Sequence, residues 1–192
     1  MAIIYVTGGA KSGKSKFAED LLLSLNDGKQ KNVYLATSVV FDEEMQKKVE
    51  LHKTRRKNNW ITVESYKNFS QSLEEVMNEN KKNKKNNMLV DCLTNMISNI
   101  IFENEEIDWE KPEKNQLEKC DKNVEKEVQN LFEIFKNFEN VVIVSNEVGM
   151  GLVPAYPLGR YFREIAGKMN QFVAEKADEA YFVVSGIPMK IK

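Results

Sequence analysis

The sequence predicts a single α/β domain, residues 1–192, in which helices flank a mostly parallel sheet. Short apolar runs alternate along the chain with longer segments of helical periodicity, which is typical of βαβ units. A glycine-rich segment joins the first apolar run to the first helical segment. A length of 192 residues allows one domain to bury a full hydrophobic core.

Six apolar runs have the length and composition of strands: residues 2–7, 32–38, 61–65, 88–92, 140–145 and 180–185. Helices are predicted over residues 14–26, 42–56, 94–103, 117–138 and 160–176, with a short helix capped by Ser70. One apolar face of the longest helix is predicted to pack in the core. Its members are Val124, Val128, Leu131, Phe132, Phe135 and Phe138. Segments 81–87, 104–116 and 146–159 are predicted as connections.

The segment after the first strand has the pattern G-x-x-x-x-G-K-[ST], which is typical of a phosphate-binding loop. Its members are Gly8, Gly9, Ala10, Lys11, Ser12, Gly13, Lys14 and Ser15. The glycines allow backbone N–H groups to point inward, and the next helix aims its positive end at the same place. Lys14 supplies a charge for the outer phosphates, and the Ser15 hydroxyl can bind Mg²⁺. These residues predict a P-loop NTPase-type fold that binds a nucleoside triphosphate with Mg²⁺.

The run Asn87-Met88-Leu89-Val90-Asp91 ends an apolar strand in a carboxylate, beside the predicted phosphate loop. P-loop enzymes commonly place an acidic residue at such a strand end, where it helps to hold Mg²⁺. The sequence therefore predicts a metal role for Asp91. The alternative is that Asp91 only caps the helix that starts near Thr94.

His52 is the only histidine in the chain, and Lys53, Arg55 and Arg56 follow it closely. Neighbouring positive charge lowers the pKa of an imidazole and keeps the ring neutral. A neutral imidazole near a triphosphate can act as a nucleophile on phosphorus or as a general base. From spacing alone, a surface or interface histidine is the simpler interpretation.

Segment 145–151 follows a buried strand, so it should lie at the same sheet edge as the phosphate loop. It is a candidate for lining the pocket of a second substrate. The alternative is an ordinary turn in which Gly149 or Gly151 adopts a positive φ.

The bulk composition limits the classes of partner. A net charge of −1 argues against a general nucleic-acid or membrane-surface binder. The spacing of Cys92 and Cys120 fits neither a disulfide framework nor a metal site, and we expect Cys92 to be a buried free thiol. We expect no signal peptide and no membrane span, and therefore a cytoplasmic protein.

Seven motifs together resemble one family. In chain order they are Thr7–Ser15, Leu35–Ser38, His52-Lys53-x-x-Arg56, Asp91–Thr94, Asn146–Gly151, Arg160–Glu164 and Asn170-Gln171. This set is similar to that of the bifunctional adenosylcobinamide kinase/adenosylcobinamide-phosphate guanylyltransferases of cobalamin biosynthesis. The resemblance runs from residue 3 to about residue 191 and is weakest over 78–87 and 103–125.

The resemblance implies two reactions. In the first, the γ-phosphate of ATP or GTP passes to the aminopropanol hydroxyl of adenosylcobinamide. In the second, GMP from GTP passes to adenosylcobinamide phosphate, which gives adenosylcobinamide-GDP and pyrophosphate. The resemblance assigns to His52 the covalent uptake of GMP.

The resemblance also implies a nucleotide-binding set and a homotrimer. Beyond the phosphate loop, that set comprises Ala36, Thr37, Ser38, Lys53, Thr54, Arg55, Arg56, Glu64 and Asp91. Members of the family often carry proline directly after the motif arginine, whereas this chain has Lys57. Proline disfavours helix at the residue before it, so the predicted helix can run further here.

Two other functions fit the phosphate loop by itself. A plain small-molecule kinase would use the loop without nucleotidyl transfer, and His52 would then be structural. A nucleotide-gated regulatory module would use the loop as a switch for a protein partner. Release of pyrophosphate from GTP separates the family reaction from both.

Overall fold

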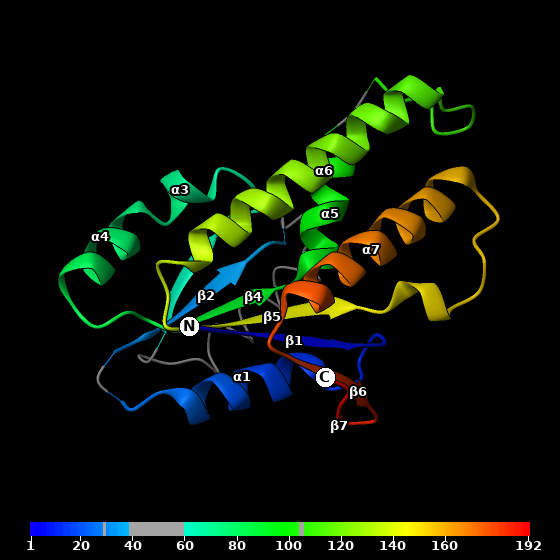
Figure 1. The fold of residues 1–192 in the computed structure, drawn as a ribbon. Helices are drawn as coiled ribbons and strands as arrows, with labels where there is room; N and C mark the ends of the chain where they lie inside the picture. Colours follow the sequence, from blue (N-terminus) through cyan, green and yellow to red (C-terminus); the bar gives the residue numbers. More distant parts are fainter. Residues whose placement is uncertain (29, 39–59, 104–105) are drawn as a thin grey trace, which may run out of the picture.

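The structure is a computed structural model that describes residues 1–28, 30–38, 60–103 and 106–192. The helix predicted over residues 42–56 lies outside the described residues. Seven strands form one sheet in the order β3-β2-β4-β5-β1-β6-β7 (Figure 1). They are β1 (Ala2–Gly8), β2 (Asn32–Ala36), β3 (Trp60–Glu64), β4 (Met88–Asp91), β5 (Asn140–Asn146), β6 (Glu179–Val184) and β7 (Ile187–Lys190).

Six of these strands run parallel, and β7 pairs antiparallel with β6. The predicted α/β class with a mostly parallel sheet is therefore confirmed. All six predicted strands are present, but β2 ends at Ala36 and does not continue to residue 38. The strand β7 was missed, because its four residues are all exposed and lack the alternation of a half-buried strand.

The helices cover both faces of the sheet. They are α1 (Lys14–Leu25), α3 (Phe69–Ser72), α4 (Glu74–Lys82), α5 (Leu93–Phe102), α6 (Lys114–Phe135) and α7 (Pro157–Lys176), with a short 3-10 helix, η2 (Val148–Met150). In Figure 1, α1 lies below the sheet, and α5, α6 and α7 lie above it. Ala18 and Leu22 of α1 pack on Ile4 and Val6 of β1, which face one side of the sheet. A larger core fills the other side.

The predicted apolar face of α6 is buried in that larger core. Val124, Val128 and Phe135 have no exposed surface, and Phe132 packs against the cluster from its edge. Phe138 is also fully buried, although α6 ends at Phe135. The helix begins at Lys114, earlier than predicted, because Glu113 and Gln116 form a reciprocal capping box there.

Three other predicted boundaries were wrong. Ser70 does not cap a helix, because α3 begins at Phe69 with Asn68 in the N-cap position. The helix α4 runs to Lys82, so the connection predicted over 81–87 starts inside a helix. The last helix begins at Pro157, whose fixed φ suits the first helical turn.

Candidate active site

The phosphate loop lies where β1 ends and α1 begins, as the sequence predicts. Gly13 is the N-cap of α1 with a φ of 93°, and Lys11 has a φ of 56°. The Ser12 N–H donates to the Gly9 carbonyl at 3.2 Å, which closes the turn of the loop. The first N–H groups of any α-helix lack partners within that helix, so the start of α1 offers donors to an anion.

Two glycines of the loop are required by close packing. A Cβ on Gly8 would lie 2.5 Å from the Val183 carbonyl oxygen, and one on Gly13 would lie 3.1 Å from Gly186 Cα. The left-handed φ of Gly13 is a second reason for glycine at that position. The loop is therefore held from the side by β6 and by the turn that follows it.

The Lys14 side chain is buried in a position where its ammonium can bind an anion. Lys14 is only 8% exposed, and its Nζ donates to the Gly9 carbonyl at 3.0 Å. Burial lowers the pKa of the Lys14 ammonium, while nearby Cys92 and Asp91 oppose that lowering. Within the described part of the chain, the buried Ser12 Oγ has no hydrogen-bond partner. Both groups can donate to a phosphate oxygen, so the residues present fit a bound nucleotide.

Asp91 does not cap α5. The N-cap of α5 is Cys92, and Asp91 lies one residue before it. Asp91 is half-buried at the end of β4, and its Oδ2 accepts a hydrogen bond from the Tyr34 hydroxyl at 2.8 Å. The capping alternative is therefore wrong, and the carboxylate is held in place by β2.

Three predicted nucleotide residues meet at the carboxyl ends of neighbouring strands. Ala36 of β2 pairs with Glu64 of β3 on one side and with Asp91 of β4 on the other. Glu64 is exposed there, and Asp91 is half-buried. The sheet order thus places Glu64 and Asp91, which follow Ala36 by 28 and 55 residues in the chain, on either side of it at the same edge as the phosphate loop.

Thr37 and Ser38 hold the end of β2 to its neighbours. Thr37 is buried, and its hydroxyl donates to the Cys92 carbonyl at 2.6 Å. Asn99 donates to the Thr37 carbonyl at 2.7 Å, and Asn95 donates to the Ser38 hydroxyl at 2.6 Å. The hydroxyl of Thr37 is thus engaged by the protein itself. A contact of residues 36–38 with nucleotide stays a prediction.

Segment 145–151 touches the phosphate loop. The Glu147 N–H donates to the Gly8 carbonyl at 3.1 Å. Neither Gly149 nor Gly151 is among the residues with positive φ, so a turn that depends on such a glycine is excluded. Within it, Val148–Met150 form a short 3-10 helix, and Met150 and the nearby Leu152 are highly exposed.

A polar network that the sequence reasoning missed fixes the base of this segment. Asn146 donates to the Thr94 hydroxyl at 2.8 Å, and Asn170 of α7 donates to the Asn146 carbonyl at 3.1 Å. The Ser145 hydroxyl donates to Asn170 Oδ1 at 2.6 Å. Thr94, Asn146 and Asn170 all belong to the quoted motifs, but only the fold shows that they bond to one another.

The histidine motif lies outside the described residues. His52, Lys53, Thr54, Arg55 and Arg56 all fall within 39–59, so their roles stay predictions. Cys92 and Cys120 are both buried thiols that form no disulfide within the described residues, as expected for Cys92. Burial raises the pKa of Cys92 to about 11, which makes it a poor nucleophile near neutral pH.

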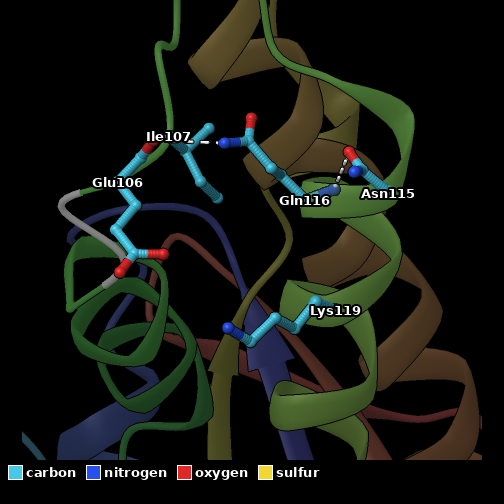
Figure 2. A pocket seen from close by; sticks show the side chains of 5 residues that line it. All are labelled: Glu106, Ile107, Asn115, Gln116 and Lys119. Atoms are coloured by element: carbon cyan, nitrogen blue, oxygen red, sulfur yellow. Dashed lines mark hydrogen bonds between the residues drawn. The ribbon is translucent and has the colours of Figure 1, made fainter.

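A cavity of about 220 Å³ lies away from these residues, between the segment before α6 and the first turns of that helix (Figure 2). Its lining consists of Glu106, Ile107, Asn115, Gln116 and Lys119. Gln116 reaches from α6 toward the segment of Glu106 and Ile107, and its side-chain amide donates to the Glu106 carbonyl at 3.2 Å. Its lining includes no residue assigned to nucleotide binding.

The comparison with known families shows the family to which this chain belongs. The family model described as cobinamide kinase / cobinamide phosphate guanyltransferase matches residues 4–191. The chain belongs to this family. The enzyme is therefore a transferase of cobalamin biosynthesis, and the resemblance drawn from its motifs is confirmed.

Relatives of the enzyme match along nearly its whole length. It is 38% identical to the bifunctional adenosylcobalamin biosynthesis protein CobU of Escherichia coli (strain K12), with 99% of each chain covered. It is 37% identical to the protein of the same name from Salmonella typhimurium, again with 99% of each chain covered. The protein CobP of Pseudomonas aeruginosa is 30% identical, with 97% of this chain and 95% of that protein covered.

A solved structure is also similar to the enzyme. It is a KaiC-like protein of the archaeon Pyrococcus horikoshii OT3, with a TM-score of 0.46 and 11% identity. The match covers 94% of this chain and 70% of that chain. Among the helices that the structure describes, none is long and apolar enough to cross a membrane.

Proposed function

We propose that the enzyme phosphorylates adenosylcobinamide and then attaches GMP to the phosphate. The first step uses ATP or GTP and acts on the aminopropanol hydroxyl. The second uses GTP, releases pyrophosphate and yields adenosylcobinamide-GDP. Family membership supports both steps, and the relatives carry the word bifunctional in their names. The observation that carries the nucleotide role is the phosphate loop, where the buried side chains of Lys14 and Ser12 offer hydrogen-bond donors to a phosphate at the start of α1.

The kinase step needs positioning and charge neutralisation more than covalent chemistry. Lys14 would exchange its bond to the Gly9 carbonyl for bonds to the outer phosphates, with the ammonium already desolvated. The segment at Glu147 is bonded to the loop at Gly8. We therefore assign residues 147–151 to the wall of the acceptor pocket, beside the γ-phosphate.

Ser15 and Asp91 are the residues that would hold Mg²⁺. Both offer oxygen ligands, which Mg²⁺ prefers, and it commonly uses one or two carboxylates together with substrate phosphates and water. When bound, the ion would neutralise charge on the triphosphate.

The guanylyl step would proceed through His52. A ring nitrogen of His52 attacks the α-phosphorus of GTP, the bond from that phosphorus to the bridging oxygen breaks, and pyrophosphate leaves. The phosphate of the acceptor then attacks the same phosphorus and frees the histidine. Lys53 and Arg56 would offset charge on the phosphates during both displacements. Glu64 and Asp91, on either side of Ala36, mark the strand ends where Ala36, Thr37 and Ser38 would contact nucleotide.

We further propose a cytoplasmic homotrimer, because the motif resemblance implies that assembly. The partners are then adenosylcobinamide, its phosphate and the nucleotides.

Product analysis tests the proposed function. The protein is incubated with adenosylcobinamide, ATP, GTP and Mg²⁺, and the corrinoids are separated and weighed by mass spectrometry. We expect adenosylcobinamide phosphate, adenosylcobinamide-GDP and stoichiometric pyrophosphate. Adenosylcobinamide phosphate without pyrophosphate would instead mean a plain kinase. Unchanged corrinoid would contradict both enzymatic functions and favour a regulatory module.

A further inference from the structure

The turn between β6 and β7 lies against the phosphate loop. The Gly186 N–H donates to the Ser12 carbonyl at 2.7 Å. At the next residue, a Cβ on Gly13 would lie 3.1 Å from Gly186 Cα and 3.6 Å from Gly186 N. One turn residue therefore both bonds to the loop and packs on it, across more than 170 residues of sequence.

The turn itself has a defined shape. Ser185 and Gly186 have φ values of 52° and 82°, and they connect Val184 and Ile187, which pair across the hairpin. Two left-handed residues in a two-residue hairpin loop are the mark of a type I′ turn. This geometry fixes the direction of the Gly186 N–H, because glycine holds such a φ without strain and the paired strands hold the turn on both sides.

The bond to Ser12 sets the orientation of one peptide group in the loop. In a trans peptide, the carbonyl and the following N–H point in opposite directions within one plane. With the Ser12 carbonyl held toward Gly186, the Gly13 N–H must point away from the hairpin. Gly13 is also the N-cap of α1, so this peptide lies where the helix meets an anion.

We propose that Gly186 is a positioning residue for the nucleotide: its N–H holds the Ser12–Gly13 peptide so that the Gly13 N–H donates to a phosphate oxygen. The inference rests on the proposed nucleotide-binding function of the loop. Gly186 itself does not touch the nucleotide in this role. It acts through the loop, and the hairpin that carries it is part of the site although β7 is an exposed edge strand.

The test compares two glycines that differ in one respect. Gly186 and Gly28 have φ values of +82° and +79°, and a Cβ on either would meet nothing within 4 Å. Valine is strained at both positions for the same backbone reason, but only Gly186 bonds to the phosphate loop. The affinity of the full-length protein for the fluorescent nucleotide mant-GTP is measured for Gly186→Val and Gly28→Val, together with their thermal midpoints.

We expect Gly186→Val to weaken mant-GTP binding by about tenfold or more, because the turn would shift to relieve the backbone strain and would release the Ser12 carbonyl. Gly28→Val should bind within about twofold of wild type, even where its thermal midpoint falls by the same amount. Selective ¹⁵N-glycine labelling gives a second readout, because the chain has only nine glycines. The Gly13 amide resonance should shift on addition of GTP in wild type and much less in Gly186→Val.

Distinct outcomes would overturn the inference. Wild-type affinity in a folded Gly186→Val protein, or an equal loss in Gly28→Val, would exclude the positioning role while leaving nucleotide binding intact. Failure of the wild-type protein to bind mant-GTP would overturn the nucleotide function of the loop, and the positioning role with it. If Gly186→Val does not fold, Gly186→Ala is measured against Gly28→Ala with the same criteria.

Discussion

At the scale of single residues, the phosphate loop contains two buried hydrogen-bond donors, Lys14 and Ser12, that form no hydrogen bond to an anionic group within the described residues. The Lys14 ammonium is desolvated and bonds to a carbonyl of its own loop. The Ser12 hydroxyl is buried, with no partner among the residues that the structure describes. A buried donor without a partner costs free energy, and a phosphate would remove that cost. Pairing these two donors with phosphate oxygens would therefore contribute to the free energy of nucleotide binding.

The proposed role of His52 gives a sharp prediction for one residue. We expect His52→Ala to lower guanylyl transfer by roughly 10³-fold or more, because the covalent intermediate cannot form. Kinase activity should largely remain, because that step takes place at the γ-phosphorus. Incubation with α-³²P-GTP, followed by acid treatment, measures the adduct, since a phosphorus–nitrogen bond is labile in acid. An acid-labile label that persists in His52→Ala would rule out this residue as the nucleophile.

At the scale of secondary structure, the sequence predicted those helices and strands whose hydrophobic residues follow a clear pattern. The buried strands and α6 are examples. A strand that is buried on both faces is a continuous apolar run, and a helix that is buried on one face has apolar residues at helical spacing. The strand β7 leaves no such pattern, although Ser185-Gly186 between two apolar runs is a usable hairpin signal. The capping pair Glu113 and Gln116 was likewise present in the sequence and was not used.

The arrangement of the site depends on strand order, which a single sequence does not encode locally. Glu64 and Asp91 were predicted one by one, and only the order β3-β2-β4 shows that they flank Ala36. Thr37 was predicted as a nucleotide contact from its motif, yet its hydroxyl bonds to the Cys92 carbonyl. Such partners come from tertiary packing, which propensity and periodicity cannot supply.

The helix α6 provides a prediction at this scale. Phe135 is fully buried at the end of α6, and the centroid of its ring lies 4.9 Å from that of Phe132. Phe135→Ala would therefore leave a large cavity. We expect the free energy of unfolding to fall by roughly 3–5 kcal/mol. Urea unfolding followed by circular dichroism measures the change. Phe102→Ala is the matched control, because Phe102 is 57% exposed and its loss should cost less than about 1 kcal/mol. Equal losses in the two variants would contradict the assigned core.

At the scale of the whole molecule, the nucleotide site joins segments from both ends of the chain. The phosphate loop follows β1, whereas the turn that packs on it lies between the last two strands. Segment 145–151 bonds to the same loop through Glu147. A nucleotide bound at the loop therefore contacts a structure that all of these segments support, and its binding should stabilise the fold as a unit.

Thermal unfolding with and without GTP tests that coupling. At 100 times its dissociation constant, a ligand that binds only the folded state adds about 2.7 kcal/mol. For a chain of this size, that corresponds to a rise in the thermal midpoint of roughly 5–11 °C. Lys14→Ala should lose most of this rise, because the mobile charge on the outer phosphates is gone. Protein concentration is held constant, since the midpoint of an oligomer depends on it. An equal rise in wild type and Lys14→Ala would show that GTP stabilises the protein from another site, and the phosphate loop would no longer be the place where its triphosphate binds.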